Sequence, residues 1–476
     1  MKRNLLLLTL LLAAACLLPV KAQVETMRRI RYKGGPAYIY RVALSDKQGT
    51  PYSLEHPMRY LSRRSVERRR RQGLAVDSTD LPVNPRYVRL IKSEDVSVIG
   101  QSRWHNTLLV RVSDTTHMQR LAQLPCVKGY KRVWTSPDSV TPSAIKTKYQ
   151  DHFEAHDSVS GQLYGTATDQ IETLKGHRLH DIGLLGEGMM IAVLDGGFKN
   201  ADRIPALQKA DIRGWRDFVC PASPSIFAET DHGTRVLSAM AVYQPYYFIG
   251  TAPRAAYWLL RSEDQQSEQE VEEDYWTMAA EFADSLGCDL INSSLGYEEY
   301  DAPCASHKLW ELDGHTAFIS QSASLLAGKG VLMVSSAGNS GMGPWKKISV
   351  PADASDILTV GAVNDMDTHR IAPFSSVGPS QDNRVKPDVV AIGAPTRVVS
   401  GRGAITDGMG TSFAAPIVCG LAACLWQAMP RKPATEIMEL IRQSGNNREH
   451  PDNVYGYGLP NFWRAYQIGS YPAQEQ

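Results

Sequence analysis

The sequence has almost no net charge, few cysteines and no long apolar run beyond its first 23 residues. Its 51 lysine and arginine residues stand against 50 aspartate and glutamate residues, a formal net charge of +1. Dedicated nucleic-acid binders usually carry a strong basic excess, so this balance argues against a nucleic-acid partner. Hydrophobic residues make up 43% of the chain, which excludes a wholly disordered protein. No transmembrane span is expected after the N-terminal stretch.

Cysteine is too scarce for a disulfide-stapled scaffold. The 476 residues include seven cysteines, and their spacing matches no zinc pattern. Cys419 and Cys424 lie in an apolar helical run and are expected to be packed thiols. Cys220 and Cys304 lie in polar, loop-like sequence, where a disulfide is allowed if the protein is exported. The spacing does not establish the pairing.

The N-terminus has the organisation of a secretion signal. Lys2 and Arg3 form a basic start, an apolar stretch follows, and small residues flank the position before a cleavage point after Ala22. Residues 1–22 are therefore expected to be a signal peptide, and the protein is expected to be exported, extracellular or periplasmic. An uncleaved anchor is one alternative, and lipid anchoring through Cys16 is another.

The near-zero net charge hides an asymmetry between two parts of the chain. Residues 24–150 carry 24 basic and 10 acidic side chains, whereas residues 151–476 carry 24 basic and 40 acidic ones. Opposite charges predict two domains with different roles. The basic run Arg68–Arg71 is expected to be a solvated helix face, with a protease target or an anion patch as alternatives. The acidic stretch Glu263–Asp274 is expected to be a solvated helix start, with calcium or a basic partner as alternatives.

Residues 24–133 are expected to form a small α+β domain, and residues 134–169 a polar, proline-containing linker with a processing region. Residues 170–467 are expected to form a second domain, followed by a tail at 468–476. The small domain has three strand candidates, at Tyr38–Leu44, Thr107–Val112 and Val127–Trp134. It has two helix candidates: a basic helix that Ser62 caps, that runs through Arg71 and that Gly73 stops, and a second at Thr115–Leu124.

The second domain alternates short apolar runs with helical segments. Runs of this kind are typical of buried parallel strands, because helices cover both faces of such a sheet. The sequence therefore predicts an α/β domain with a mostly parallel sheet flanked by helices on both faces. The strand candidates are Met190–Leu194, Tyr257–Leu260, Leu290–Ser293, Val331–Ser335 and Ile357–Val360.

Four short motifs in this domain carry residues suited to acyl-transfer chemistry. Asp195 closes a buried strand before two glycines, where ligand sites lie in open α/β sheets. His232 begins an apolar helix. Asn339 follows a strand and can direct an amide at a developing oxyanion. Ser412 starts a buried helix, whose free N–H groups favour negative charge. Each of these residues also has a plain structural interpretation when taken alone. Asp195 and Asn339 could be turn residues, His232 could cap its helix, and Ser412 could be an ordinary N-cap.

Taken together, the order Asp195, His232, Asn339 and Ser412 resembles the subtilisin-like serine peptidases. Both H-G-T-x-V at His232 and G-T-S-x-A-x-P at Ser412 are intact. The resemblance covers about residues 170–467. Further segments follow the family order: Gly250-Thr251-Ala252-Pro253, Ile291 to Gly296, Val350-Pro351-Ala352, Phe374 to Pro379, Lys386 to Val389 and Tyr455 to Gly458.

The resemblance implies a serine endopeptidase that acts on polypeptide substrates through an acyl-enzyme intermediate. Ser412 would be the nucleophile, His232 the general base and Asp195 its partner, with Asn339 and the Ser412 N–H binding the oxyanion. The segment Ser293, Ser294, Leu295 and Gly296 resembles the strand that pairs with extended substrate. This chemistry requires no cofactor and no metal. The family often uses structural calcium, but no ligand set can be assigned.

The resemblance also gives the N-terminal domain a role. Subtilisin-like precursors often carry a propeptide that assists folding and inhibits the protease until it is cut, and residues 24–133 have a suitable size and position. The opposite charges of the two domains would favour docking. A retained accessory domain is the alternative.

One departure from the family is Gly196, where a serine or threonine usually follows the aspartate. A catalytically silent exported binding protein on this scaffold is the alternative function.

Overall fold

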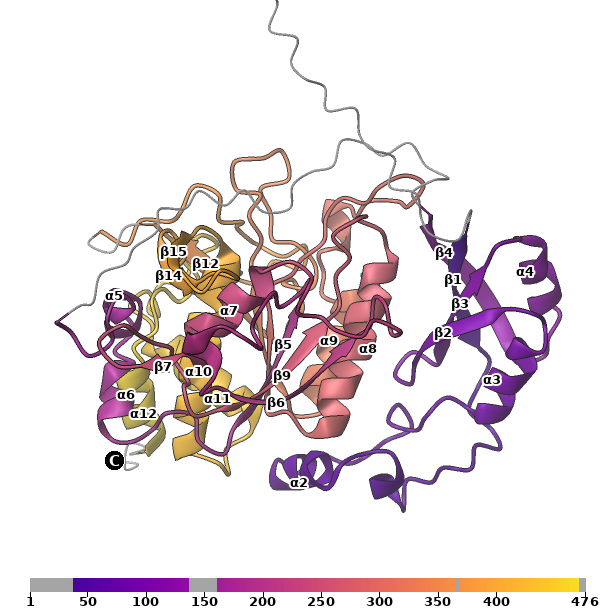
Figure 1. Cartoon of the computed structure of the whole chain (residues 1–476), viewed down its shortest axis with the longest axis horizontal. Helices are drawn as coiled ribbons and strands as arrows, with labels where there is room; N and C mark the ends of the chain where they lie inside the picture. The colour runs from indigo at the N-terminus through magenta and orange to yellow at the C-terminus, as the bar shows by residue number, and fades with distance from the viewer. Residues whose placement is uncertain (1–36, 137–160, 365–367, 471–476) are drawn as a thin grey trace, which may run out of the picture.

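The computed structural model describes residues 37–136, 161–364 and 368–470. These residues form a small domain with an antiparallel sheet beside a larger domain with a parallel sheet (Figure 1). The predicted fold class is confirmed. The predicted signal peptide, with Cys16, and most of the predicted linker lie outside the described residues.

The small domain is a four-stranded antiparallel sheet with the strand order β2-β3-β1-β4. Side chains alternate between the faces of a strand. On β1, Tyr40, Val42 and Leu44 pack against α3 and α4 in one core, while Ile39 joins a different core on the opposite face. The elements are β1 (Tyr38–Leu44), η1 (Pro57–Arg59), α2 (Arg63–Arg71), α3 (Pro85–Lys92), β2 (Ser97–Ser102), β3 (Thr107–Val112), α4 (Thr116–Leu121) and β4 (Val127–Thr135).

The strands predicted in this domain are confirmed to within one residue. The helix capped by Ser62 is also confirmed. The Ser62 hydroxyl accepts a hydrogen bond from the Ser65 N–H at 3.1 Å. The predicted helix Thr115–Leu124 is shorter, at Thr116–Leu121. Strand β2 and helix α3 were not predicted. The sequence of β2 is largely polar and contains a glycine, so it lacks the alternation that marks a strand.

The larger domain is built on seven parallel strands in the order β13-β12-β11-β10-β5-β9-β6. All five predicted strands are present; β10 has the predicted bounds, and the other four are extended or shifted by up to three residues. The strands at the two edges were not predicted. The strands are β5 (Met190–Asp195), β6 (Asp211–Asp217), β9 (Ala256–Arg261), β10 (Leu290–Ser293), β11 (Leu332–Ser336), β12 (Leu358–Val363) and β13 (Val389–Ile392).

Helices cover both faces of this sheet, as β5 shows. Its residues Ile191 and Val193 join the core that includes α7 and α10, whereas Ala192 and Leu194 join the core that includes α8 and α9. Two short hairpins complete the domain. These elements are α5 (Thr168–Glu172), α6 (His177–Asp181), η3 (Pro205–Leu207), α7 (His232–Ala241), β7 (Tyr243–Gln244), β8 (Phe248–Ile249), α8 (Val271–Leu286), η4 (Leu309–Glu311), α9 (Phe318–Gly328), β14 (Thr396–Val399), β15 (Ile405–Gly408), α10 (Thr411–Ala428), α11 (Ala434–Ser444) and α12 (Phe462–Ser470).

Helix α10 is the central helix of the domain. Within the described residues it alone is long and apolar enough to cross a membrane by length and composition, but 89% of it is buried in the protein. Cys419 and Cys424 lie on this helix and are buried thiols, as predicted. Cys220 and Cys304 are both free thiols, so the disulfide that the sequence allowed is not formed.

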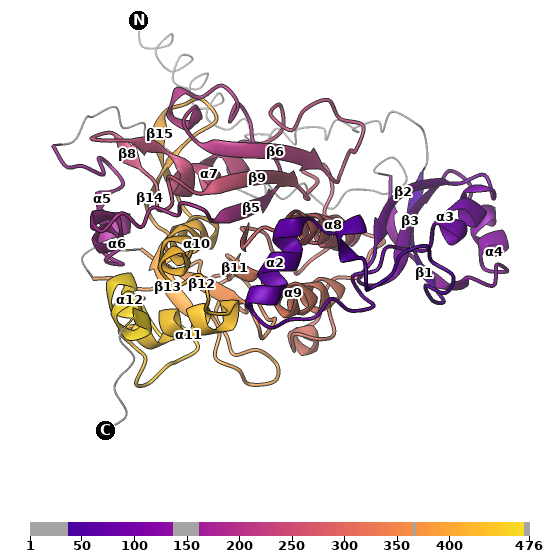
Figure 2. The ribbon, with the colours of Figure 1, turned by 90° about the horizontal axis from the view of Figure 1, so that it is seen from below.

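The small domain lays the second face of its sheet on helices α8 and α9 (Figures 1 and 2). Ile39, Leu109 and Trp134 share a core with Trp276 and Met278 of α8. The apolar contact is continuous with the core of the larger domain. The two domains therefore pack as one body along this face.

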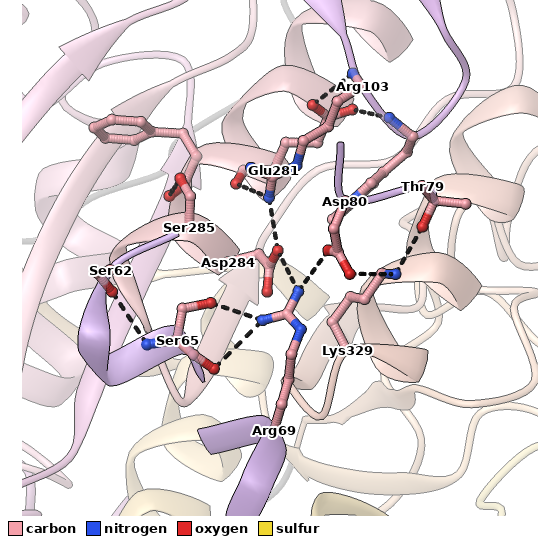
Figure 3. A network of polar contacts seen from close by, with 12 residues as sticks. Ser62, Ser65, Arg69, Thr79, Asp80, Arg103, Glu281, Asp284, Ser285 and Lys329 are labelled. Carbon is pink, nitrogen blue, oxygen red and sulfur yellow. Dashed lines mark hydrogen bonds and ion pairs between the residues drawn. The ribbon is translucent and has the colours of Figure 1, made fainter. Parts of the chain in front are cut away.

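Charged side chains also cross the contact, and they correct half of the prediction for Arg68–Arg71: Arg70 and Arg71 are exposed, as predicted, but the other two are not. Arg68 and Arg69 of α2 are fully buried, not solvated, and both contact the carboxylate of Asp284 at the end of α8. Figure 3 shows Arg69 between Asp284 and Asp80, with Arg69 Nη2 2.9 Å and 2.8 Å from them. The sequence could not show this, because Asp284 lies more than 200 residues farther along the chain.

The prediction of a solvated acidic stretch at Glu263–Asp274 is also wrong, because its last residues are buried under the small domain. Asp274 forms a bidentate pair with Arg41 at 2.6 and 2.7 Å, and Glu270 contacts both Arg41 and Lys131. The alternative of a basic partner holds for these two residues. That partner is the small domain of the same chain.

Candidate active site

The sheet order brings the predicted site residues to one edge. Strand β5 lies at the centre, with β9 on one side and β10 on the other, and Asp195 is its last residue. Because all the strands are parallel, their carboxyl ends share this edge. His232 is the first residue of α7, Ser412 the second residue of α10, and Asn339 follows β11.

Asp195 and His232 form a buried pair. His232 Nδ1 lies 2.9 Å from each carboxylate oxygen of Asp195, and the side chains are 3% and 0% exposed. The backbone N–H of Gly196 also donates to Asp195, at 2.8 Å. Burial raises the pKa of Asp195 above its ordinary value, while the neighbouring His232 acts in the opposite direction. The contact through Nδ1 fixes the orientation of the imidazole.

Gly233 lets α7 begin close against the backbone that follows Asp195. Its N–H donates to the Gly197 carbonyl at 3.0 Å. A Cβ atom on Gly233 would lie 2.9 Å from both the Cβ of Asp195 and the ring of Phe198, and closer still to the Gly197 carbonyl oxygen. The glycine of the H-G-T motif therefore sets the separation of Asp195 and His232.

We expect Gly233→Ala to lower kcat/KM by about 100-fold, because displacing a positioned group by about 1 Å has an effect of that size. Gly328→Ala is the matched control, since Gly328 is also helical and a Cβ there would meet no atom within 4 Å. Steady-state kinetics on a chromogenic peptide measure both variants. Equal activity of the two would show that the close approach at Gly233 does not position the pair.

Ser412 and Ser294 hold each other through two hydrogen bonds. The Ser294 hydroxyl donates to the Ser412 carbonyl at 2.8 Å, and the Ser412 hydroxyl donates to the Ser294 carbonyl at 3.2 Å. Asn292 in turn donates to the Ser294 hydroxyl at 3.0 Å. The predicted substrate-binding segment is thus fixed directly to the residue predicted as nucleophile. The motif did not reveal this role of Ser294.

The rest of that segment is divided between core and surface. Ser293 is buried and accepts a hydrogen bond from the indole N–H of Trp276 at 2.9 Å, and Leu295 is also buried. Gly296 is exposed at the end of the segment. Its backbone is therefore the part accessible to a ligand.

Asn339 is oriented by Thr411, the residue before Ser412. Its side-chain oxygen accepts hydrogen bonds from the backbone N–H of Thr411 at 2.9 Å and from its hydroxyl at 3.0 Å. The acceptor side of the amide is thereby occupied, which leaves the NH2 group as a donor beside the start of α10. The threonine of the G-T-S motif, unassigned from the sequence, has this positioning role.

The space beside Gly196 is filled by side chains from elsewhere. A Cβ on Gly196 would lie 2.7 Å from Gln265, 3.0 Å from the Glu263 carboxylate and 3.2 Å from Thr230. Glu263 also contributes to the raised pKa of Asp195 by charge repulsion. Sequence reasoning missed both Glu263 and Gln265, since neither belongs to a motif.

No calcium ligands can be assigned. Within the part of the chain that the structure describes, no group of three or more histidine, cysteine, aspartate or glutamate side chains is arranged to hold a metal ion.

Two family models match the chain, one for each domain. The model of the Subtilase family matches residues 186–458, more than half of the chain. The model of the Peptidase S8 propeptide domain of Bacteroidota matches residues 39–150.

Curated relatives agree with the larger match. Subtilisin Savinase of Lederbergia lenta is 29% identical over 292 residues, covering 61% of this chain and 95% of that protein. M-protease of Shouchella clausii is also 29% identical over 292 residues, covering 61% and 67%. The membrane-bound transcription factor site-1 protease of Mus musculus is 29% identical over 320 residues, covering 64% and 27%.

Proposed function

The chain belongs to the subtilase family of serine endopeptidases and carries an N-terminal propeptide domain, and from this we propose that Asp195, His232 and Ser412 are its catalytic triad. The observation that carries the proposal is the buried contact of His232 Nδ1 with both oxygens of Asp195. That contact leaves Nε2 of the imidazole as the atom that accepts a proton.

In the proposed first step, the Ser412 oxygen attacks the carbonyl carbon of the scissile peptide bond, and His232 Nε2 takes the hydroxyl proton. The hydroxyl now donates to Ser294 at 3.2 Å, so it must rotate toward His232. The buried Asp195 carboxylate stabilises the imidazolium that forms. His232 then passes the proton to the leaving amine as the C–N bond breaks, which leaves an acyl ester on Ser412.

The second step repeats this chemistry with water. His232 takes a proton from the water, whose oxygen attacks the ester carbon, and returns it to the Ser412 oxygen as the ester bond breaks. In both steps we propose that the carbonyl oxygen, negatively charged in the tetrahedral intermediate, accepts hydrogen bonds from the Asn339 NH2 group and the Ser412 N–H. Neither step requires a cofactor.

Asn339→Ala is expected to lower kcat by roughly 100- to 1000-fold while KM changes little, because the hydrogen bond forms fully only in the transition state. Asn339→Asp is the companion variant. It keeps an oxygen for Thr411 but replaces the donor with an acceptor, so we expect it to be at least as slow. Near-normal kcat in both variants would exclude Asn339 from the oxyanion hole.

Labelling with a fluorophosphonate probe tests the proposal as a whole. The probe should modify the processed protein at one residue, and peptide mapping by mass spectrometry should place it on Ser412. Heat-denatured protein is the control for reactivity that does not depend on the fold. A folded, processed protein that takes no label would favour the alternative of a silent binding protein.

The other proposals concern the N-terminal parts of the chain. We propose that the small domain is removed by cleavage between the two domains and that residues 1–22 direct export. The docked contact of Arg41, Arg68 and Arg69 with α8 supports the first. The basic start, apolar stretch and cleavage point after Ala22 support the second. Lipid anchoring through Cys16 is the alternative for the export route.

A further inference from the structure

Arg261 is a buried cation at the same sheet edge as the proposed catalytic pair. It is the last residue of β9 and stands in register with Asp195 at the end of β5 and with Asp217 at the end of β6. Its side chain is only 6% exposed. Because a guanidinium stays protonated in proteins, Arg261 places a fixed positive charge one strand away from the Asp195 carboxylate.

The guanidinium of Arg261 connects three segments of the chain. Nη1 donates to Oδ2 of Asp217 at 2.9 Å. Nε donates to the carbonyl oxygen of Gly196 at 3.1 Å. Nη2 lies 3.4 Å from the carboxylate of Glu229, in the loop that leads into α7. One side chain therefore ties the end of β6 to the backbone that follows β5 and to the loop before α7.

Asp217 gives this side chain a rigid anchor. Its carboxylate is 1% exposed, and Oδ1, the oxygen that does not contact Arg261, accepts hydrogen bonds from the backbone N–H groups of Val219 at 2.9 Å and Cys220 at 2.7 Å. Both oxygens of a buried carboxylate are thus occupied, and a shift of either would leave a polar group unpaired at low dielectric. The position of the guanidinium is therefore fixed from the β6 side.

The contact with Gly196 links Arg261 to the catalytic carboxylate. The N–H of Gly196 donates to Asp195 at 2.8 Å, while its carbonyl accepts from Arg261. Gly196 and Gly197 have no side chains that restrict their backbone, so hydrogen bonds must determine where this segment lies. Arg261 holds the carbonyl of the same residue whose N–H orients Asp195.

The contact with Glu229 links Arg261 to the other member of the pair. Glu229 precedes Thr230, whose hydroxyl accepts a hydrogen bond from the His232 N–H at 3.4 Å. The Glu229 side chain is 34% exposed, so this ion pair is the weaker of the two links to the site. The buried bonds to Gly196 and Asp217 should therefore dominate.

Resting on the proposed function, we infer that Arg261 is a positioning residue for Asp195 and His232. It holds the backbone after the aspartate and the loop before the histidine in the relative arrangement that proton transfer requires. It carries no proton in the reaction. Lysine cannot take over this role, because a single ammonium on a flexible chain can pair with Asp217 but does not present a rigid fork of donors to three partners.

The test compares Arg261→Lys with the wild type on a peptide substrate, after incubation long enough for complete processing. Fluorophosphonate titration counts the active sites, so that misfolded molecules do not enter kcat. We expect kcat to fall by about 100-fold, the effect of displacing a positioned group by about 1 Å. KM should stay within about twofold, because Arg261 does not contact substrate.

Arg442→Lys is the matched control. Arg442 pairs with the buried Asp388 at 2.8 and 2.9 Å, but Asp388 immediately precedes β13 and so lies at the opposite edge of the parallel sheet from the site. Its kcat should stay within about twofold of the wild type, as expected for a distant, independent position.

A near-normal kcat in Arg261→Lys, a loss confined to KM, or an equal loss in Arg442→Lys would overturn the inference and leave the proposed function intact. If Arg261→Lys has no titratable sites, Asp217→Asn supplies the same measurement from the other end of the contact, and a normal kcat there would also overturn it. Failure of the wild type to label or to cut the peptide would instead overturn the proposed function.

Discussion

Replacing Ser412 by alanine is expected to lower kcat by about a million-fold and to leave the precursor uncut. The variant keeps the 2.8 Å hydrogen bond from Ser294 to the backbone carbonyl of residue 412, so the fold should be retained. It loses the only oxygen that the proposed mechanism uses as the nucleophile. Any residual rate would come from substrate binding and the oxyanion donors alone.

Gel analysis of the purified variant and hydrolysis of a peptide substrate measure both effects. Ser355→Ala removes a half-buried hydroxyl that contacts the adjacent Asp356; it is the control and should be processed like the wild type. If the Ser412→Ala precursor still cuts itself when purified free of other proteases, Ser412 is not the nucleophile.

The second large effect is expected at Asp284, whose carboxylate meets three arginines of the propeptide domain. Arg68 and Arg69 contact it from α2, and Arg103 donates to it at 2.7 Å. Removing one partner of a buried ion pair costs roughly 3–5 kcal/mol, because the other charges remain buried without compensation. Asp284→Ala should therefore lower the free energy of unfolding of the uncut Ser412→Ala precursor by about that amount.

The same contact should make the precursor sensitive to acid. Burial alone would raise the pKa of Asp284, but Arg68, Arg69 and Arg103 lower it to about 2, from the ordinary 3.8. Since the folded state holds the pKa down, the stabilisation is complete above about pH 4 and is lost as the pH falls toward 2. Asp284→Ala should remove this part of the pH dependence.

Urea unfolding at pH 7 and at several lower pH values measures the free energy of unfolding of the precursor and its dependence on pH. Glu67→Ala is the matched control, because Glu67 pairs with Arg63 on the same helix, but at the surface, with side chains 44% and 84% exposed. Exposed pairs contribute about 0–1 kcal/mol. If Asp284→Ala destabilises the precursor no more than Glu67→Ala does, the buried network does not stabilise the docked domain.

The sequence predicted the parts of the fold that depend on local pattern. Strand β10 was placed at Leu290–Ser293, its full length in the structure, because a short apolar run between polar residues is a strong signal. Helix α2 was placed within a residue or two for the same kind of reason, with Ser62 as its cap. The prediction failed where burial depends on a distant partner: the arginines of α2 read as solvated because Asp284 is remote in sequence.

In the candidate site, too, the sequence predicted the residues that belong to local motifs and missed those whose partners are distant in the chain. Asp195, His232, Asn339 and Ser412 belong to short motifs, so the sequence identified them. The groups that orient them do not: Thr411 holds Asn339, and Ser294 holds Ser412, through contacts between separate elements. Only the folded chain shows such contacts.

The connection between the two domains has a consequence for the timing of activation. Before cleavage, α2 and the small sheet dock on α8 within one molecule, so the docked fraction does not depend on protein concentration. A cut within residues 137–160 leaves every contact of Arg41, Arg68 and Arg69 in place but makes the association bimolecular. From then on the bound fraction follows mass action. Under the proposed export, dilution outside the cell would separate the two pieces, whereas in a crowded, concentrated compartment the cut protease would stay paired with its propeptide.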